Sequence, residues 1–143
     1  MSFLNTFNNM LFGNNFNGGY QSRNNNRFCQ YRPMYKQVPI EQAKDMILNN
    51  KINLIDVRSK NEYDMVKIKN SINIPIDIFE KTIINVIPNK NENIMIYCAN
   101  GDRSKTAVKI LNRLGYNNVY IWEYAALATF PFKDMLIYGN QEK

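Results

Sequence analysis

The fold of this chain is decided by one stretch, Ile94-Met95-Ile96-Tyr97-Cys98-Ala99-Asn100-Gly101-Asp102-Arg103-Ser104. It opens on an apolar run of strand length. The residues after it follow a helical pattern with one apolar face, made by Ala107, Val108, Leu111 and Leu114. Cys98 is therefore predicted at the carboxyl end of a buried strand, where a loop leads into a helix. Ligands of open α/β sheets bind at this place.

The loop itself is suited to hold an anion. Gly101 lets the backbone take positive φ, so the loop can curl and direct its N–H groups inward. Arg103 keeps a permanent positive charge near the Cys98 sulfur, and the Ser104 hydroxyl is expected to accept from N–H groups at the helix start. The chain has no histidine, so a Cys–His pair is excluded. The loop dipoles and Arg103 are then the groups that favour a reactive thiolate.

Three blocks of the sequence resemble the rhodanese family. The loop is similar to the family's Cys-x-x-Gly-x-Arg-Ser, Leu54–Tyr63 resembles its Asp-Val-Arg followed by Glu-Tyr, and Ser71–Pro75 resembles its Ala-Ile-Asn-Ile-Pro. Their order and spacing match a single-domain rhodanese over about residues 38–135. The resemblance implies a sulfurtransferase.

The resemblance also implies a mechanism. The matching cysteine of the family takes sulfane sulfur from a donor, such as thiosulfate or a persulfide, and passes it from its own persulfide to a thiol or cyanide. Carried over, Cys98 is the catalytic sulfur carrier, in a ping-pong scheme that needs no cofactor and no metal ion. The persulfide would be held by the rest of the loop, Ala99, Asn100, Gly101, Asp102, Arg103 and Ser104.

Two other functions remain open at this point. A non-catalytic rhodanese-like binding or scaffold module would explain the altered glycines described below, although such a module has no physical need for a cysteine in an anion nest. A phosphatase-like or arsenate-reductase-like enzyme would use the same thiol. The related phosphatases have five residues between Cys and Arg, whereas four separate Cys98 from Arg103, which gives a smaller cradle.

The sequence departs from the family in three places. The family's Gly-His-Ile is here Val66-Lys67-Ile68, and its late Gly-Gly is here Ala125-Ala126, where we expect a slightly different backbone rather than strained alanines. Asp102 beside Arg103 nearly cancels the charge of the loop. We therefore expect thiosulfate, a dianion, to be a poorer donor than an organic or protein persulfide.

Two further groups of residues have structural interpretations. Arg58 and Glu62 are expected to form a local ion pair that fixes the turn after the first buried strand, with Asp56 beside them, and none of the three is assigned to catalysis. Trp122 is expected to pack in the core.

The chain divides into two parts. Residues 1–37 form an Asn-rich extension expected to be disordered, and residues 38–143 form the rhodanese-like domain. In the extension, an amphipathic helix around Phe3, Phe7 and Leu11 that touches a membrane surface or a partner is the alternative. Cys29 is interpreted as an incidental thiol; the alternative is that it accepts sulfur from Cys98 or pairs with it.

Composition narrows the setting. The net charge is +6, and the first 37 residues carry four basic residues and no acidic one, so the domain is nearly neutral and nucleic-acid binding is not expected. No apolar run reaches the length of a membrane span, and no secretory signal is recognised. Two distant cysteines fit a reducing compartment, so a cytoplasmic location is expected, with a persulfide donor and a thiol acceptor as partners.

Short apolar strands alternating with helical patterns predict the fold class. We expect an α/β domain with a mainly parallel sheet and helices on both faces. The expected strands are 35–38, 54–57, 72–74, 94–97 and 119–121; the expected helices are 39–48, 60–65, 76–86 and 103–114, with one or two further helical turns in 130–138.

Overall fold

The computed structural model describes residues 32–139. The predictions for the amphipathic helix and for Cys29 lie outside these residues, and the domain boundary stays a prediction. The described elements are β1 (Lys36–Val38), α3 (Ile40–Leu48), β2 (Asn53–Asp56), α4 (Lys60–Met65), β3 (Val66–Ile68), β4 (Ser71–Asn73), α5 (Phe79–Val86), β5 (Ile94–Tyr97), α6 (Asp102–Leu114), β6 (Val119–Trp122) and β7 (Leu136–Tyr138).

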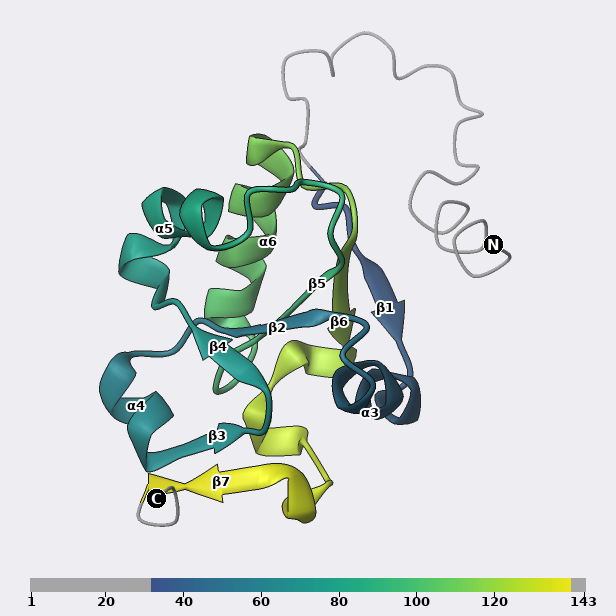
Figure 1. Ribbon diagram of the computed structural model, residues 1–143, viewed down its shortest axis with the longest axis vertical. Coiled ribbons are helices and arrows are strands. Elements are labelled where there is room, and N and C mark those ends of the chain that lie inside the picture. The colour runs from purple at the N-terminus through teal and green to yellow at the C-terminus, as the bar shows by residue number, and fades with distance from the viewer. Residues whose placement is uncertain (1–31, 140–143) are drawn as a thin grey trace, which may run out of the picture. The chain divides into compact units, whose positions relative to one another are not determined.

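The main sheet has five strands in the order β1-β6-β5-β2-β4. Every pair in it is parallel, and β5 lies at its centre between β2 and β6. Figure 1 shows α5 and α6 on one side of the sheet and α3 on the other. The predicted fold class is therefore confirmed, because parallel strands joined by helical crossovers bury both faces of their sheet.

The alternation of side chains along β5 divides the core into two halves. Ile94, Ile96 and Cys98 face α5 and α6, whereas Met95 and Tyr97 face α3. Trp122, 1% exposed, lies in the half under α3, as expected. Since Cys98 continues the alternation, its side chain points into the half that α5 and α6 cover.

Local signals set the helix ends. Ser59 and Glu62 form a capping box at the start of α4: the Ser59 hydroxyl accepts from the Glu62 N–H, and the Glu62 carboxylate accepts from the Ser59 N–H. Gly115 ends α6 with φ of 96°, a conformation that glycine adopts without a Cβ penalty. A 3-10 turn over Ile76–Ile78 precedes α5, so the expected helix over 76–86 is divided in two.

The C-terminal end of the described chain differs from expectation. Residues Lys133–Met135 form only a 3-10 turn, and Leu136–Tyr138 form β7, which pairs antiparallel with β3. The expectation of one or two helical turns over 130–138 was thus half wrong, and β3 was not expected as a strand. β3 and β7 are short strands, and each is defined by pairing with the other rather than by its own sequence.

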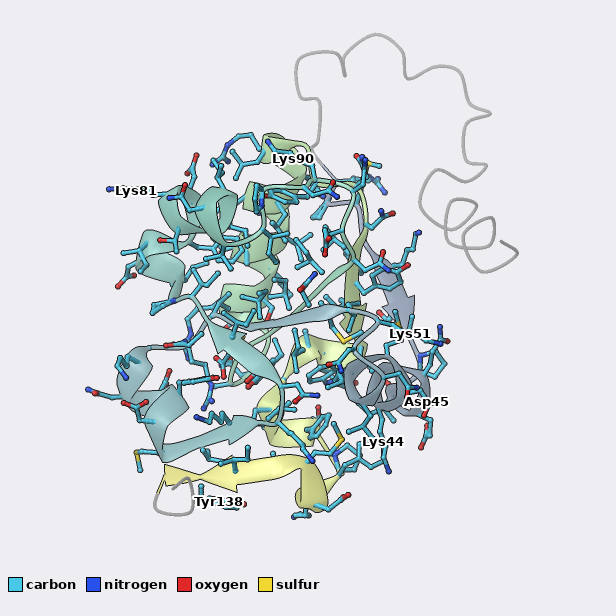
Figure 2. The ribbon with its side chains drawn as sticks, viewed as in Figure 1. Lys44, Asp45, Lys51, Lys81, Lys90 and Tyr138 are labelled. Atoms are coloured by element: carbon cyan, nitrogen blue, oxygen red, sulfur yellow. The ribbon has the colours of Figure 1, made fainter. Side chains whose placement is uncertain are left out.

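The β3–β7 pair lies beyond the main sheet. Figure 2 shows Tyr138 of β7 and Lys90, which precedes β5, at opposite ends of the part formed by residues 32–139. Lys44 of α3 lies near the β7 end, with its Nζ 4.5 Å from the centre of the Phe132 ring. Among residues 32–139, no helix has the length and apolar character needed to span a membrane.

Candidate active site

Cys98 lies where sequence reasoning placed it, directly after the central strand β5 and before α6. The Gly101 N–H donates to Cys98 Sγ at a donor–acceptor distance of 3.0 Å. Gly101 is the N-terminal cap of α6, with φ of 99°, so the loop has the left-handed turn that its glycine predicted. An amide at the start of a helix therefore points at the sulfur.

Cys98 lies below the protein surface, whereas parts of the loop after it are exposed. Cys98 is fully buried, whereas Asn100 and Asp102 are exposed and Arg103 is half-buried. The Asn100 side-chain carbonyl accepts from the Asp102 N–H at 3.1 Å, so that amide supports the turn rather than the sulfur. Because no part of Cys98 is exposed, a donor molecule can reach Sγ only when the protein around it moves.

Arg103 is held by an ion pair that was not expected. Its two terminal nitrogens donate to the Glu62 carboxylate, at 2.8 Å and 3.3 Å. The hydrogen bond from Arg103 lowers the pKa of Glu62, and the hydrogen bond to Glu62 raises the pKa of Arg103, with a smaller contribution from charge at Cys98. The same carboxylate caps α4, so Glu62 joins the start of that helix to the loop.

The expected Arg58–Glu62 ion pair was therefore wrong. Arg58 binds Asp56 instead, with its Nη2 2.7 Å from Asp56 Oδ2, and both side chains are buried. Burial by itself would lower the pKa of Arg58, but the hydrogen bond and charge of Asp56 outweigh it and the pKa is raised. Asp56 is fully buried, whereas Glu62 is partly exposed. A buried charge without a partner is costly, so Arg58 pairs with Asp56 rather than with Glu62.

The Asp56–Arg58 pair lies on the other side of the sheet, where it helps to hold β3 in place. Arg58 also donates to the Val66 carbonyl at the start of β3, and the Tyr97 hydroxyl accepts from the Ile68 N–H at 3.1 Å. Burial raises the pKa of Tyr97 well above its usual range, and the charge of Asp56 adds to this. Tyr97 and Cys98 point to opposite faces of the sheet, so this network holds β3 and does not face the sulfur.

The turn after β6 forms hydrogen bonds with both ends of the loop. The Ala125 carbonyl accepts from the Cys98 N–H at 3.0 Å and from the Ser104 hydroxyl at 3.2 Å. The Leu127 N–H donates to the Cys98 carbonyl at 2.7 Å. Ser104 thus donates to this turn, and the expectation that its hydroxyl accepts from the helix start was wrong.

Two residues of this turn have a left-handed backbone. Tyr124 has φ of 69° and Ala125 has φ of 47°, whereas Ala126 is extended with φ of −126°. The expectation that no alanine here is strained was therefore wrong for Ala125. The left-handed backbone begins one residue before the Ala125-Ala126 pair, at Tyr124.

The described residues offer no metal centre. Among residues 32–139, no group of three or more His, Cys, Asp and Glu side chains is placed to hold a metal ion.

A comparison with protein families assigns this chain to a known one. The model of the rhodanese-like domain matches residues 39–124, which is more than half of the chain. The chain therefore belongs to the rhodanese-like family, as the three sequence blocks predicted.

Individual relatives agree with this assignment. Thiosulfate sulfurtransferase PspE of Escherichia coli is 35% identical over 65 residues, 46% of this chain and 62% of the relative. A tRNA uridine(34) hydroxylase of Photorhabdus laumondii is 33% identical over 97 residues, 62% of this chain but only 28% of the relative. The solved structure of an E. coli rhodanese with anions aligns with a TM-score of 0.51 at 29% identity, over 62% of this chain and 99% of that one. This chain thus spans under two thirds of both sequence relatives.

Proposed function

We propose that this protein is a sulfurtransferase that carries sulfane sulfur as a persulfide on Cys98. The observation that carries the proposal is the Gly101 N–H, 3.0 Å from Cys98 Sγ at the start of α6. The relative PspE, whose name is thiosulfate sulfurtransferase, supports the same chemistry. The chain is well suited to a reducing compartment such as the cytoplasm, where the Cys98 thiol stays free.

The transfer takes place in two balanced steps. The Cys98 thiolate attacks the outer sulfur of the donor; a new S–S bond forms at Cys98, and the donor's own S–S bond breaks to release a thiolate or, from thiosulfate, sulfite. The acceptor thiolate then attacks the outer sulfur of the Cys98 persulfide. That step forms the acceptor persulfide and returns Cys98 as a thiolate. The backbone N–H groups of Ala99, Asn100 and Gly101 stabilise the anionic sulfur between the steps.

Thiosulfate is the poorer donor in this proposal. The charge of Arg103 is offset by Glu62 at 2.8 Å, and Asp102 is exposed beside it. A dianion therefore meets little net positive charge, whereas a small organic persulfide such as cysteine persulfide carries a single net negative charge. Steady-state kcat/KM for thiosulfate below that for cysteine persulfide is the expected result; the reverse order would overturn this donor preference.

Intact mass spectrometry tests the persulfide directly. Incubated with a persulfide donor and freed from excess reagent, the protein should gain the mass of one sulfur atom, and peptide mapping should place it on Cys98. Cys98→Ser should lose this adduct, whereas Cys29→Ser should keep it. A Cys29→Ser variant that transfers sulfur at the normal rate would also show that Cys29 is not the internal acceptor.

A binding module without catalysis is the second candidate, and the full burial of Cys98 favours it. If the loop never opens, iodoacetamide should fail to alkylate Cys98 in the folded protein, and no donor should load it. Alkylation at neutral pH, together with loading, would favour the enzyme.

A further inference from the structure

Tyr124, in the turn after β6, has a strained backbone. It and Ala125 are consecutive left-handed residues, at φ of 69° and 47°. Each costs about 1–2 kcal/mol in this conformation relative to a right-handed one. Glycine would adopt both conformations without the penalty. Strain of this kind persists where it serves a site, and it calls for a reason at this position.

Burial of the side chain does not explain the strained backbone of Tyr124. Its side chain is 65% exposed, whereas Ala125 is 3% exposed and packs in the protein. An exposed ring contributes little to folding, so a tyrosine at this position is not explained by the stability of the domain. The ring is instead presented to solvent on a strained backbone.

The position of Tyr124 relative to the loop is defined by Gly101. A Cβ on Gly101 would lie 2.5 Å from the Tyr124 carbonyl oxygen, so the two backbones touch. The N–H of the same Gly101 points at Cys98 Sγ. Tyr124 follows β6 and Cys98 follows β5, neighbouring parallel strands that end at the same edge of the sheet. Tyr124 therefore borders the loop that follows Cys98, on the side opposite the β2 strand that leads to Glu62.

We propose that the Tyr124 ring contacts the carbon body of the thiol that receives sulfur from Cys98. An aromatic ring gives apolar area and a hydroxyl to an organic thiol such as a peptide cysteine, but nothing comparable to a small inorganic acceptor such as cyanide. Tyr124 is then a specificity residue for organic thiols. This inference rests on the proposed sulfur transfer and names the class of its acceptor; the bonds made and broken are those of the second step above.

The test compares two acceptors on one loaded enzyme. The full chain and its Tyr124→Asn, Tyr124→Gly and Tyr124→Phe variants are loaded from the same donor, and kcat/KM is measured with glutathione and with cyanide. Asparagine tolerates the left-handed region and removes the ring, so it separates the ring from the backbone. Phenylalanine keeps the ring.

The expected result is a change in the ratio of the two kcat/KM values. Tyr124→Asn and Tyr124→Gly should lower the glutathione-to-cyanide ratio about two- to tenfold, the range that one aromatic contact supplies, mainly through KM for glutathione. Tyr124→Phe should retain most of the ratio. Tyr124→Gly and Tyr124→Asn should both keep or raise Tm, because the strain is reduced.

Three outcomes would overturn the inference. An unchanged ratio in both ring-less variants would show that the ring does not contact the acceptor. If the ratio is unchanged because kcat/KM falls equally with both acceptors, Tyr124 acts on the loop and not on the acceptor. Failure of the unaltered protein to transfer sulfur to either acceptor would refute the proposed function as well, whereas transfer by the unaltered protein with an unchanged ratio refutes only the role of Tyr124.

Discussion

Replacing Gly101 by alanine should damage both the fold and the site, for two separable reasons. The residue has φ of 99°, where an alanine costs about 1–2 kcal/mol. Its new Cβ would also lie 2.5 Å from the Tyr124 carbonyl oxygen, closer than real Cβ atoms come to backbone. The turn after β6 must shift, and overpacking of this kind costs about 1–3 kcal/mol more.

Gly115 provides a matched control for the first of these costs. It has nearly the same φ, 96°, but a Cβ there would lie 3.7 Å from the flexible Lys90 Cδ, an ordinary contact. Gly115→Ala should therefore lose only the backbone cost of about 1–2 kcal/mol. The difference in unfolding free energy between the two variants isolates the contact with Tyr124.

Urea and thermal unfolding, followed by far-ultraviolet circular dichroism, measure these costs. Each kcal/mol lowers Tm by roughly 4–8 °C in a domain of this size, so Gly101→Ala should melt about 10 °C or more below the unaltered protein. Persulfide loading by mass spectrometry should fall in Gly101→Ala and stay normal in Gly115→Ala. Equal destabilisation in the two variants, or normal loading in Gly101→Ala, would refute the reasoning.

Three further predictions concern the ion pairs and the buried hydroxyl. Asp56→Ala leaves Arg58 buried without its partner and should destabilise the protein by about 3–5 kcal/mol in urea unfolding; a loss under 1 kcal/mol would contradict this. Glu62→Gln keeps the cap but removes the charge facing Arg103 and should cost about 0.5–1 kcal/mol at pH 7, since the pair is partly exposed. Because the folded protein lowers the pKa of Glu62, this difference should be complete above the ordinary value of about 4.3 and be lost progressively as the pH falls from that value through the lowered pKa; a difference that grows in acid would exclude the pair as its source. Tyr97→Phe leaves the β3 N–H without its acceptor and should cost about 1–3 kcal/mol, measured by thermal unfolding against the unaltered protein, with persulfide loading retained.

Features encoded by neighbouring residues were predictable. The strand Ile94–Tyr97 and the helix Lys60–Met65 have the bounds expected from sequence. The first is a compact apolar run, and the second begins at a capping box of Ser59 and Glu62, residues three apart. The placement of Cys98 at the end of the central strand follows from the same kind of signal. Hydrophobic period and capping act within a few residues, so a single sequence displays them.

Features that depend on a distant partner were not predictable. The pairing of β3 with β7 and the choice of Arg103 rather than Arg58 by Glu62 each join residues far apart in the chain. The sequence determined that this protein is a parallel α/β domain with a cysteine in an amide-lined loop, because periodicity and loop chemistry are local. Only the tertiary structure decided which carboxylate holds Arg103 and which residue borders the loop, because the order of strands in the sheet brings those groups together.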